Sequence, residues 1–113
     1  MMDRDPARQR AEGVQDMDTF KEACAVFGEE NALARLGMFR DELEAHLSWV
    51  ATGPADHQSL RDMAHRTAGR AGVLGFAALA DASAQLDEAA RDDTGLAATL
   101  DHWMEQAKRA ARG

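Results

Sequence analysis

The sequence has 113 residues, a length that suits one domain with one hydrophobic core. It carries 20 acidic and 13 basic side chains, for a formal charge of −7, which argues against nucleic acid or an anionic membrane as the main partner because both attract cationic surfaces. The single cysteine excludes an intrachain disulfide, and no apolar run reaches the roughly 20 residues that span a bilayer. Because the N-terminus also lacks an apolar signal stretch, we expect a cytoplasmic protein.

The residue types favour helices. Isoleucine and tyrosine are absent, valine is rare, and alanine, leucine, glutamate and arginine dominate, a helix-forming set with little β preference. Residues 1–15 are polar and without periodicity, so we predict a flexible N-terminal tail there and one all-α domain over residues 16–113.

Two helices are expected before the first clear turn. The first is short, is capped by Asp18 or Thr19 and ends at Gly28. Its inward residues are Phe20, Ala23, Cys24 and Phe27. The second is long, covers residues 30–51 and carries an apolar stripe at three- and four-residue steps. This stripe consists of Leu36, Phe39, Leu43, Leu47 and Val50.

Three further helices follow the Thr-Gly-Pro turn at residues 52–54. Asp56 caps the third helix, and Gly75 ends or kinks it; the fourth runs over residues 76–91 and the fifth over residues 96–111. The inward positions of the last two are Leu79, Ala82, Leu86, Ala90, Leu100, Trp103 and Ala107. Short loops between amphipathic helices predict an antiparallel up-down four-helix bundle, with the short first helix added at one end.

The third helix holds the most informative pattern. Each residue advances about 100° around the axis, so its apolar residues fall within roughly 100° of arc and form one buried stripe. These residues are Leu60, Met63, Ala64, Thr67, Ala71 and Leu74. His65, Gly69 and Gly72 lie together outside the stripe, although an interior glycine costs about 1 kcal/mol relative to alanine. We interpret the glycines as access for something large that approaches the imidazole; the alternative is close packing by another helix of the same chain.

This segment resembles the histidine-containing phosphotransfer (HPt) domain of bacterial phosphorelays. The typical run of that family is Ala-His-x-Leu-Lys-Gly-Ser-x-x-x-Leu-Gly. This chain matches it, at the family's spacing, with Ala64-His65, Gly69 and Leu74-Gly75. The resemblance covers about residues 18–109.

Two further segments carry the resemblance, and one position departs from it. Leu86-Asp87 is similar to a later pair in the family, and Phe39 stands in a Phe-centred pattern like that of the preceding family helix. The departure is Ala68, where the family has a lysine that is thought to help hold the phosphoryl group.

The resemblance implies a phosphotransfer intermediate rather than a kinase. His65 would accept a phosphoryl group from an aspartate of a receiver domain, in a response regulator or hybrid kinase, and pass it to another. The receiver would supply the aspartate and a Mg²⁺ ion. This chain would act as a monomer without metal, cofactor or ATP-binding domain, and would supply a nucleophilic imidazole. Arg61, one turn before His65 on the same side, is the best substitute for the lysine, while Arg66 and Arg70 would have to reach around the helix.

A docking face for the receiver is expected around the imidazole. Its expected members are Ala68, Gly69, Gly72, Gln58, Asp62 and Met38. Gln58 and Asp62 either hydrogen-bond to the ring or are simply solvated. Trp49 either extends an exposed apolar patch with Met38 or fills space at the end of the bundle.

Three other functions are alternatives to this one. A non-phosphorylated helical adaptor that binds receiver domains is the main alternative, and the missing lysine favours it. A histidine-kinase dimerisation domain usually has an acidic residue directly after the histidine, where this chain has Arg66. A metal or redox enzyme has no supporting cluster, because His46, His57 and His102 lack the spacing of metal ligands.

Overall fold

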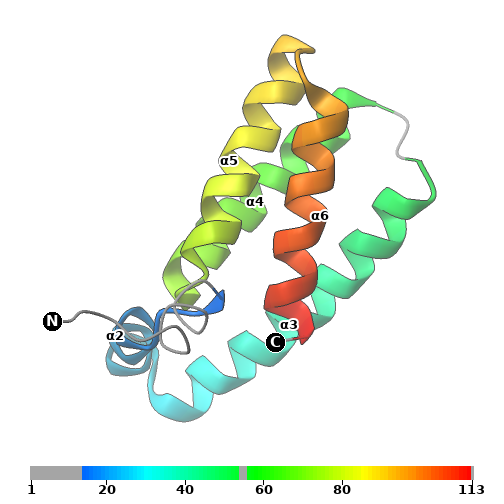
Figure 1. Ribbon diagram of the computed structural model, residues 1–113. Helices are drawn as coiled ribbons and strands as arrows, with labels where there is room; N and C mark the ends of the chain where they lie inside the picture. Colours follow the sequence, from blue (N-terminus) through cyan, green and yellow to red (C-terminus); the bar gives the residue numbers. More distant parts are fainter. Residues whose placement is uncertain (1–13, 54–55, 113) are drawn as a thin grey trace, which may run out of the picture.

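The computed structural model describes residues 14–53 and 56–112, and these residues form helices and turns without a strand (Figure 1). In chain order the helices are α2 (Met17–Phe27), α3 (Glu29–Ala51), α4 (His57–Leu74), α5 (Ala77–Asp92) and α6 (Leu96–Arg112). The predicted all-α class is confirmed for this part of the chain. No helix within it is both long and apolar enough to cross a membrane. The predicted N-terminal tail lies, up to residue 13, outside the described residues.

The helices do not pack against one another equally. α5 packs along both α4 and α6, and α6 packs along α3, whereas α3 and α4 touch over only a short stretch. The short α2 lies at the end of the molecule where α3 begins, and it contacts both α3 and α4 (Figure 1). The seam between α3 and α4 is therefore the most open line in the packing.

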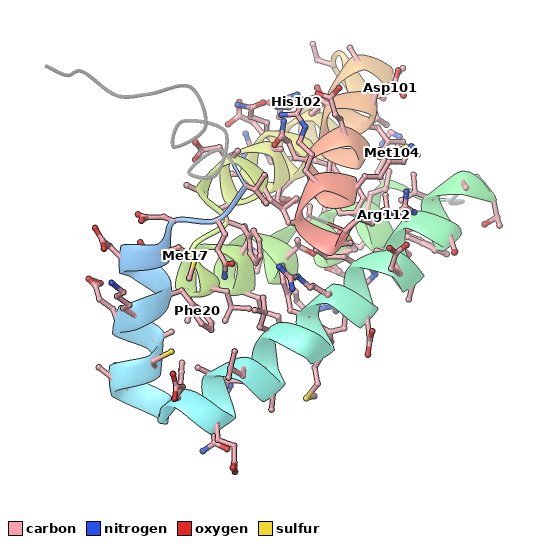
Figure 2. All side chains as sticks on the ribbon, turned by 60° about the horizontal axis from the view of Figure 1, so that its bottom comes forward. Met17, Phe20, Asp101, His102, Met104 and Arg112 are labelled. Atoms are coloured by element: carbon pink, nitrogen blue, oxygen red, sulfur yellow. The ribbon has the colours of Figure 1, made fainter. Side chains whose placement is uncertain are left out.

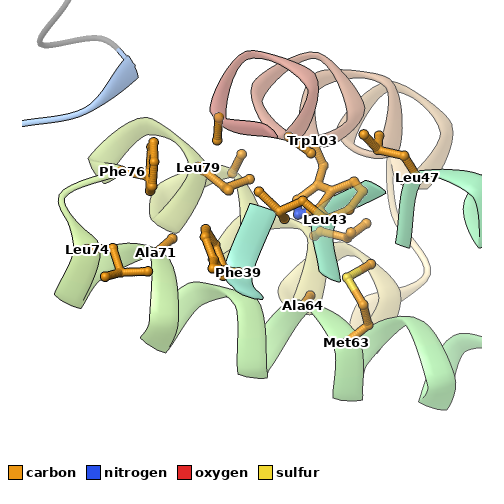
Figure 3. Close-up of a cluster of buried hydrophobic side chains, with 14 of the residues drawn as sticks. Phe39, Leu43, Leu47, Met63, Ala64, Ala71, Leu74, Phe76, Leu79 and Trp103 are labelled. Carbon is orange, nitrogen blue, oxygen red and sulfur yellow. The ribbon is translucent and has the colours of Figure 1, made fainter. Parts of the chain in front are cut away.

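The core joins the inner faces of the four long helices (Figure 3). Trp103 of α6 is fully buried, and its indole N–H donates a hydrogen bond of 2.9 Å to Ser83 Oγ of α5. The rings of Phe39, from α3, and Phe76, which precedes α5, stack with their centroids 5.7 Å apart. The apolar stripes predicted from the sequence are buried, except for three half-buried members: Cys24, Phe27 and Leu100.

The N-terminal caps explain where two of the helices begin. Asp56 caps α4 as predicted, because its carboxylate accepts a hydrogen bond of 2.7 Å from the Ser59 N–H. α2 begins earlier than predicted: its cap is Asp16, whose carboxylate accepts from the Asp18 N–H at 3.1 Å. The expectation that Asp18 or Thr19 caps this helix is therefore corrected, and both lie inside its first turn.

The chain before α2 is fixed to the end of α4. The Asp16 N–H donates to the Gly75 carbonyl at 2.6 Å, and the Gln15 side-chain amide donates to the Leu74 carbonyl at 3.0 Å. Val14 packs against the hydrophobic core. Val14 and Gln15, which the sequence predicts to be part of the tail, are therefore attached to the helices.

Two arginines tie the end of α6 to α3. Arg112 reaches over α3 (Figure 2) and donates from Nε and Nη2 to the two carboxylate oxygens of Glu44, each at 3.0 Å. This pairing holds the pKa of the Glu44 carboxyl below its usual value. Arg40 of α3 donates from Nε to the Ala110 carbonyl at 3.2 Å, which provides a hydrogen-bond partner for one of the last carbonyl groups of α6.

Candidate functional site

α4 turns His65 outward because its apolar residues occupy the other side of the helix. All six residues of the predicted stripe are buried: Leu60, Met63, Ala64, Thr67, Ala71 and Leu74. Thr67, the polar member, donates its hydroxyl hydrogen to the Met63 carbonyl at 2.8 Å and so leaves no unpaired group in the core. The side chain of His65 is exposed, so the imidazole is open to solvent and to a partner.

His65 faces a shallow hollow of about 230 Å³ between α4 and α5. The other residues that line it come from these two helices: Gln58, Arg61, Asp62, Arg66 and Asp87. A water molecule takes about 30 Å³ in the liquid, so the hollow has room for a group of several heavy atoms beside the imidazole.

The structure separates the three arginines of α4. Arg61 donates from Nε to Asp87 Oδ1 of α5 at 3.0 Å, at the edge of the His65 hollow. Arg70 donates from Nη1 to Glu42 of α3 and is not among the residues that line this hollow, so the structure does not bring it to the imidazole. Arg66 lines the hollow and has no ion pair with any described carboxylate.

The polar residues beside His65 bond to each other rather than to the ring. Gln58 Nε2 donates to Asp62 Oδ1 at 2.8 Å, and among the described residues neither forms a hydrogen bond with His65. Both side chains are exposed, which agrees with the solvated alternative from the sequence. Ala68, about one turn after His65, is half-buried and contributes no charge.

A larger groove of about 400 Å³ follows the open seam between α3 and α4. Gly69 and Val73 line it from α4, Met38 and Phe39 line it from α3, and α2 contributes Phe27. The side chains of Met38 and Val73 are 66 % and 49 % exposed, although both are apolar. Exposed apolar side chains beside a groove are typical of a surface that a partner covers.

A third hollow of about 230 Å³ holds His46 and Trp49 against the α4 surface, and Arg66 lines it as well. Trp49 is half-buried and packs against the core, and it is not among the residues that line the groove of Met38. Burial lowers the pKa of His46; the Glu42 carboxylate opposes this shift, and the positive charges of Arg66 and Arg70 add to it. Because Arg66 lines all three hollows, they adjoin one another around it.

The two glycines of α4 lie in open space. A Cβ atom built on Gly69 or Gly72 would meet no atom within 4 Å beyond its own backbone surroundings. No described helix therefore packs against either residue, and close internal packing does not explain these glycines in the described part of the chain. A surface without side chains thus lies beside the exposed His65.

The remaining histidines, His57 and His102, do not line the hollow that contains His65. His57 Nε2 lies 3.7 Å from Asp93 Oδ1, and His102 is exposed on α6 (Figure 2). Over residues 14–53 and 56–112, no group of three or more His, Cys, Asp or Glu side chains is placed to hold a metal ion.

The sequence does not predict Asp87 as a lining residue of the hollow, nor six of the residues that line the groove: Phe27, Arg35, Phe39, Glu42, Val73 and Leu74. The sequence places Asp87 only in a motif and Phe27 only among the inward residues of its helix. Both reach the surface of α4 from other helices. The opposite charges of Arg61 and Asp87 were the one signal in the sequence, but nothing in the sequence indicates that these two residues face each other.

Comparison with known proteins assigns the family. A family model of the Hpt domain matches residues 33–110, which is well over half of the chain and includes all of α4 and α5. No curated protein and no solved structure gives a significant match. The matched range contains the exposed His65, its hollow and the open glycines, and the chain therefore belongs to the Hpt domain family.

Proposed function

We propose that this protein carries phosphoryl groups between receiver domains: His65 accepts the group from a receiver aspartate and passes it to an aspartate of another receiver. The family's role in histidine phosphotransfer supports this function. The observation that supports His65 as the acceptor is its exposed side chain beside the open positions of Gly69 and Gly72. We also propose that the carrier is a bacterial, cytoplasmic monomer and that α3 to α6 form an antiparallel up-down bundle.

The proposed transfer needs little from the carrier beyond a well-placed nucleophile. The lone pair on His65 Nε2 attacks the phosphorus of an aspartyl phosphate. The N–P bond forms as the P–O bond breaks, the electron pair leaves on the aspartate oxygen, and the Nδ1 proton stays on the ring. In the next transfer a receiver carboxylate attacks the phosphorus, and the pair returns to Nε2. Positioning and positive charge dominate catalysis of such steps, and the receiver is expected to supply Mg²⁺.

The receiver is proposed to dock over His65 and the groove between α3 and α4. Met38 and Val73 offer exposed apolar contact area there, and Arg35 and Arg66 line the same groove. An acidic rim around the receiver aspartate would complement these arginines, although the whole chain carries a charge of −7.

The test is to mix the full chain with receiver domains that carry a radiolabelled aspartyl phosphate. We expect the chain to gain label as a receiver loses it, and a second, unlabelled receiver to recover that label from the chain. The label should be acid-labile and base-stable, as a phosphohistidine is, and should map to the peptide that contains His65. The proposal fails if every receiver of the source organism keeps its label, or if the label maps to another residue.

A non-phosphorylated adaptor is the second candidate function. Ala68 favours it, because a lysine at this position is absent and the half-buried alanine offers no charge to a phosphoryl group. An adaptor would bind receivers, as measured by calorimetry, and would take no label from any of them. The same mixing experiment therefore separates the two functions.

Substitutions of Gly69 and Gly72 should distinguish an effect on the stability of the fold from an effect on the access of a receiver to His65. Gly69→Ala and Gly72→Ala should each raise the free energy of unfolding by about 0.5–1 kcal/mol, because an added Cβ meets open space and glycine weakens a helix interior. Gly69→Gln should preserve stability but slow transfer from a receiver by about tenfold or more, because its side chain would hold the partner away from His65. Urea unfolding and transfer time courses measure the two effects.

Gly37 provides the matched control for this prediction. It is also an exposed helical glycine with open space around its Cβ position, but it lies on α3 outside the three hollows. Gly37→Gln should leave the transfer rate unchanged. Equal rates for Gly69→Gln and Gly37→Gln would place the docking face elsewhere.

A further inference from the structure

The positive charge beside His65 comes from a different position than the family resemblance implies. Position 68, three residues after His65, holds alanine. Arg61, four residues before His65, lines the same hollow as the imidazole. Residues three and four apart lie on one face of a helix, one turn from each other. Arg61 and a side chain at position 68 would therefore approach the imidazole from opposite ends.

Asp87 holds Arg61 in this position. Arg61 Nε donates to Asp87 Oδ1 at 3.0 Å, and the pair joins α4 to α5 with side chains only 36 % and 30 % exposed. The bond uses Nε alone, and a guanidinium has four further N–H donors on its two Nη atoms. The arginine is thus fixed at its inner nitrogen while its outer nitrogens remain able to donate. Fixing it in advance reduces the entropy that it would lose on binding a ligand.

The other two arginines of α4 are less well placed. Arg70 is bound to Glu42 of α3 and does not line the His65 hollow. Arg66 lines that hollow, but it also lines the two hollows on the α3 side, and no described carboxylate fixes it. Among the described α4 arginines, Arg61 is the one that both lines the hollow and is held by a neighbouring helix.

We propose that Arg61, positioned by Asp87, donates its Nη hydrogens to the phosphoryl oxygens on His65 and replaces the cation that position 68 lacks. This inference rests on the proposed function. A planar guanidinium suits phosphoryl oxygens because it can donate two parallel hydrogen bonds. Arg61 exchanges no proton or electrons in the step; the bonds that form and break are those given above. Asp87 does not touch the phosphoryl group and is a positioning residue.

The experiment measures how fast phosphoramidate, a small phosphoryl donor, phosphorylates His65 in the full chain, with ammonia as the leaving group. This donor needs no receiver, so the docking face does not affect the rate. Arg61→Gln should lower the rate about 10- to 100-fold, the range expected for the loss of a charge-assisted hydrogen bond. Arg61→Gln/Ala68→Lys should recover most of the rate. A lysine at position 68 would not repair a merely structural defect at Arg61, so rescue identifies an electrostatic role.

Two further variants test the positioning role and the specificity of the effect. Asp87→Asn keeps the shape of the side chain but weakens its hold on Arg61, so we expect a smaller loss that Ala68→Lys also rescues. Arg109→Gln removes a comparable arginine, paired with Glu105 on α6, and should react at the wild-type rate. Half-exposed ion pairs contribute little to stability, so all variants should fold, and thermal unfolding checks this.

The outcomes separate this inference from the proposed function. If wild-type protein takes no phosphoryl group from either phosphoramidate or a receiver, the proposed function fails. If wild type and Arg61→Gln react at the same rate, only the role of Arg61 fails. A loss in Arg66→Gln without a loss in Arg61→Gln would assign the charge to Arg66, and a folded double variant without rescue would also overturn the inference.

Discussion

Glutamine in place of His65 should abolish phosphorylation and leave the fold intact. The glutamine amide nitrogen has no free lone pair to attack phosphorus, so no label should pass from a phosphorylated receiver. His65 is exposed and has no hydrogen bond within the described residues, and substitutions at such positions usually change the free energy of unfolding by no more than about 0.5 kcal/mol. Label transfer and urea unfolding of the His65→Gln variant measure the two quantities.

Binding provides the second half of this prediction. The groove between α3 and α4 does not include His65 among its lining residues, so His65→Gln should still bind the receiver, as calorimetry would show. His102→Gln is the matched control, because His102 is also exposed but lies on α6; this variant should accept label normally. Label on the His65→Gln protein would contradict the assignment of the phosphoacceptor.

The helices and their buried faces were predictable because they depend on local periodicity. The stripe from Leu60 to Leu74 repeats at three- and four-residue steps, and all six members are buried. The cap of α2 was not predictable in the same way. Asp18 and Thr19 have suitable side chains, but Asp16 takes the role while its backbone is bonded to Gly75. That bond joins residues 59 positions apart, and no pattern in the sequence indicates it.

In the candidate site, too, the features set by local sequence were predictable and those set by contacts between helices were not. The outward direction of His65 follows from its angle on the α4 wheel, as does its separation from Arg70, whereas the wheel does not predict that Arg66 lines the His65 hollow. The partners of these arginines do not follow from it. Arg61 meets Asp87 because α4 and α5 pack closely, and Arg70 meets Glu42 across the open seam to α3. Helix packing therefore determines which carboxylates Arg61 and Arg70 bind.

Gly75→Ala should be the most destabilising single substitution among the glycines of α4 and its C-terminal cap. Gly75 ends α4 with a φ of 95°, in the left-handed region that side chains other than glycine adopt at a cost of about 1–2 kcal/mol. A Cβ atom there would also lie 2.5 Å from the Asp16 carbonyl oxygen. Because that atom belongs to the backbone, the segment before α2 must move, and the hydrogen bond from the Asp16 N–H to the Gly75 carbonyl must weaken. We expect a total loss of about 2–4 kcal/mol, a large part of the 5–15 kcal/mol typical of small domains.

Gly95→Ala separates the two causes of this loss. Gly95 also has a positive φ, of 62°, but a Cβ atom there would meet nothing within 4 Å. Its substitution should cost only the conformational strain of about 1 kcal/mol. Urea unfolding of both variants measures the difference, which reports the contact between Gly75 and Asp16. If the two variants lost equal stability, the attachment of the N-terminal segment to the end of α4 would contribute nothing to folding, and the position of α2 beside the docking groove would need another explanation.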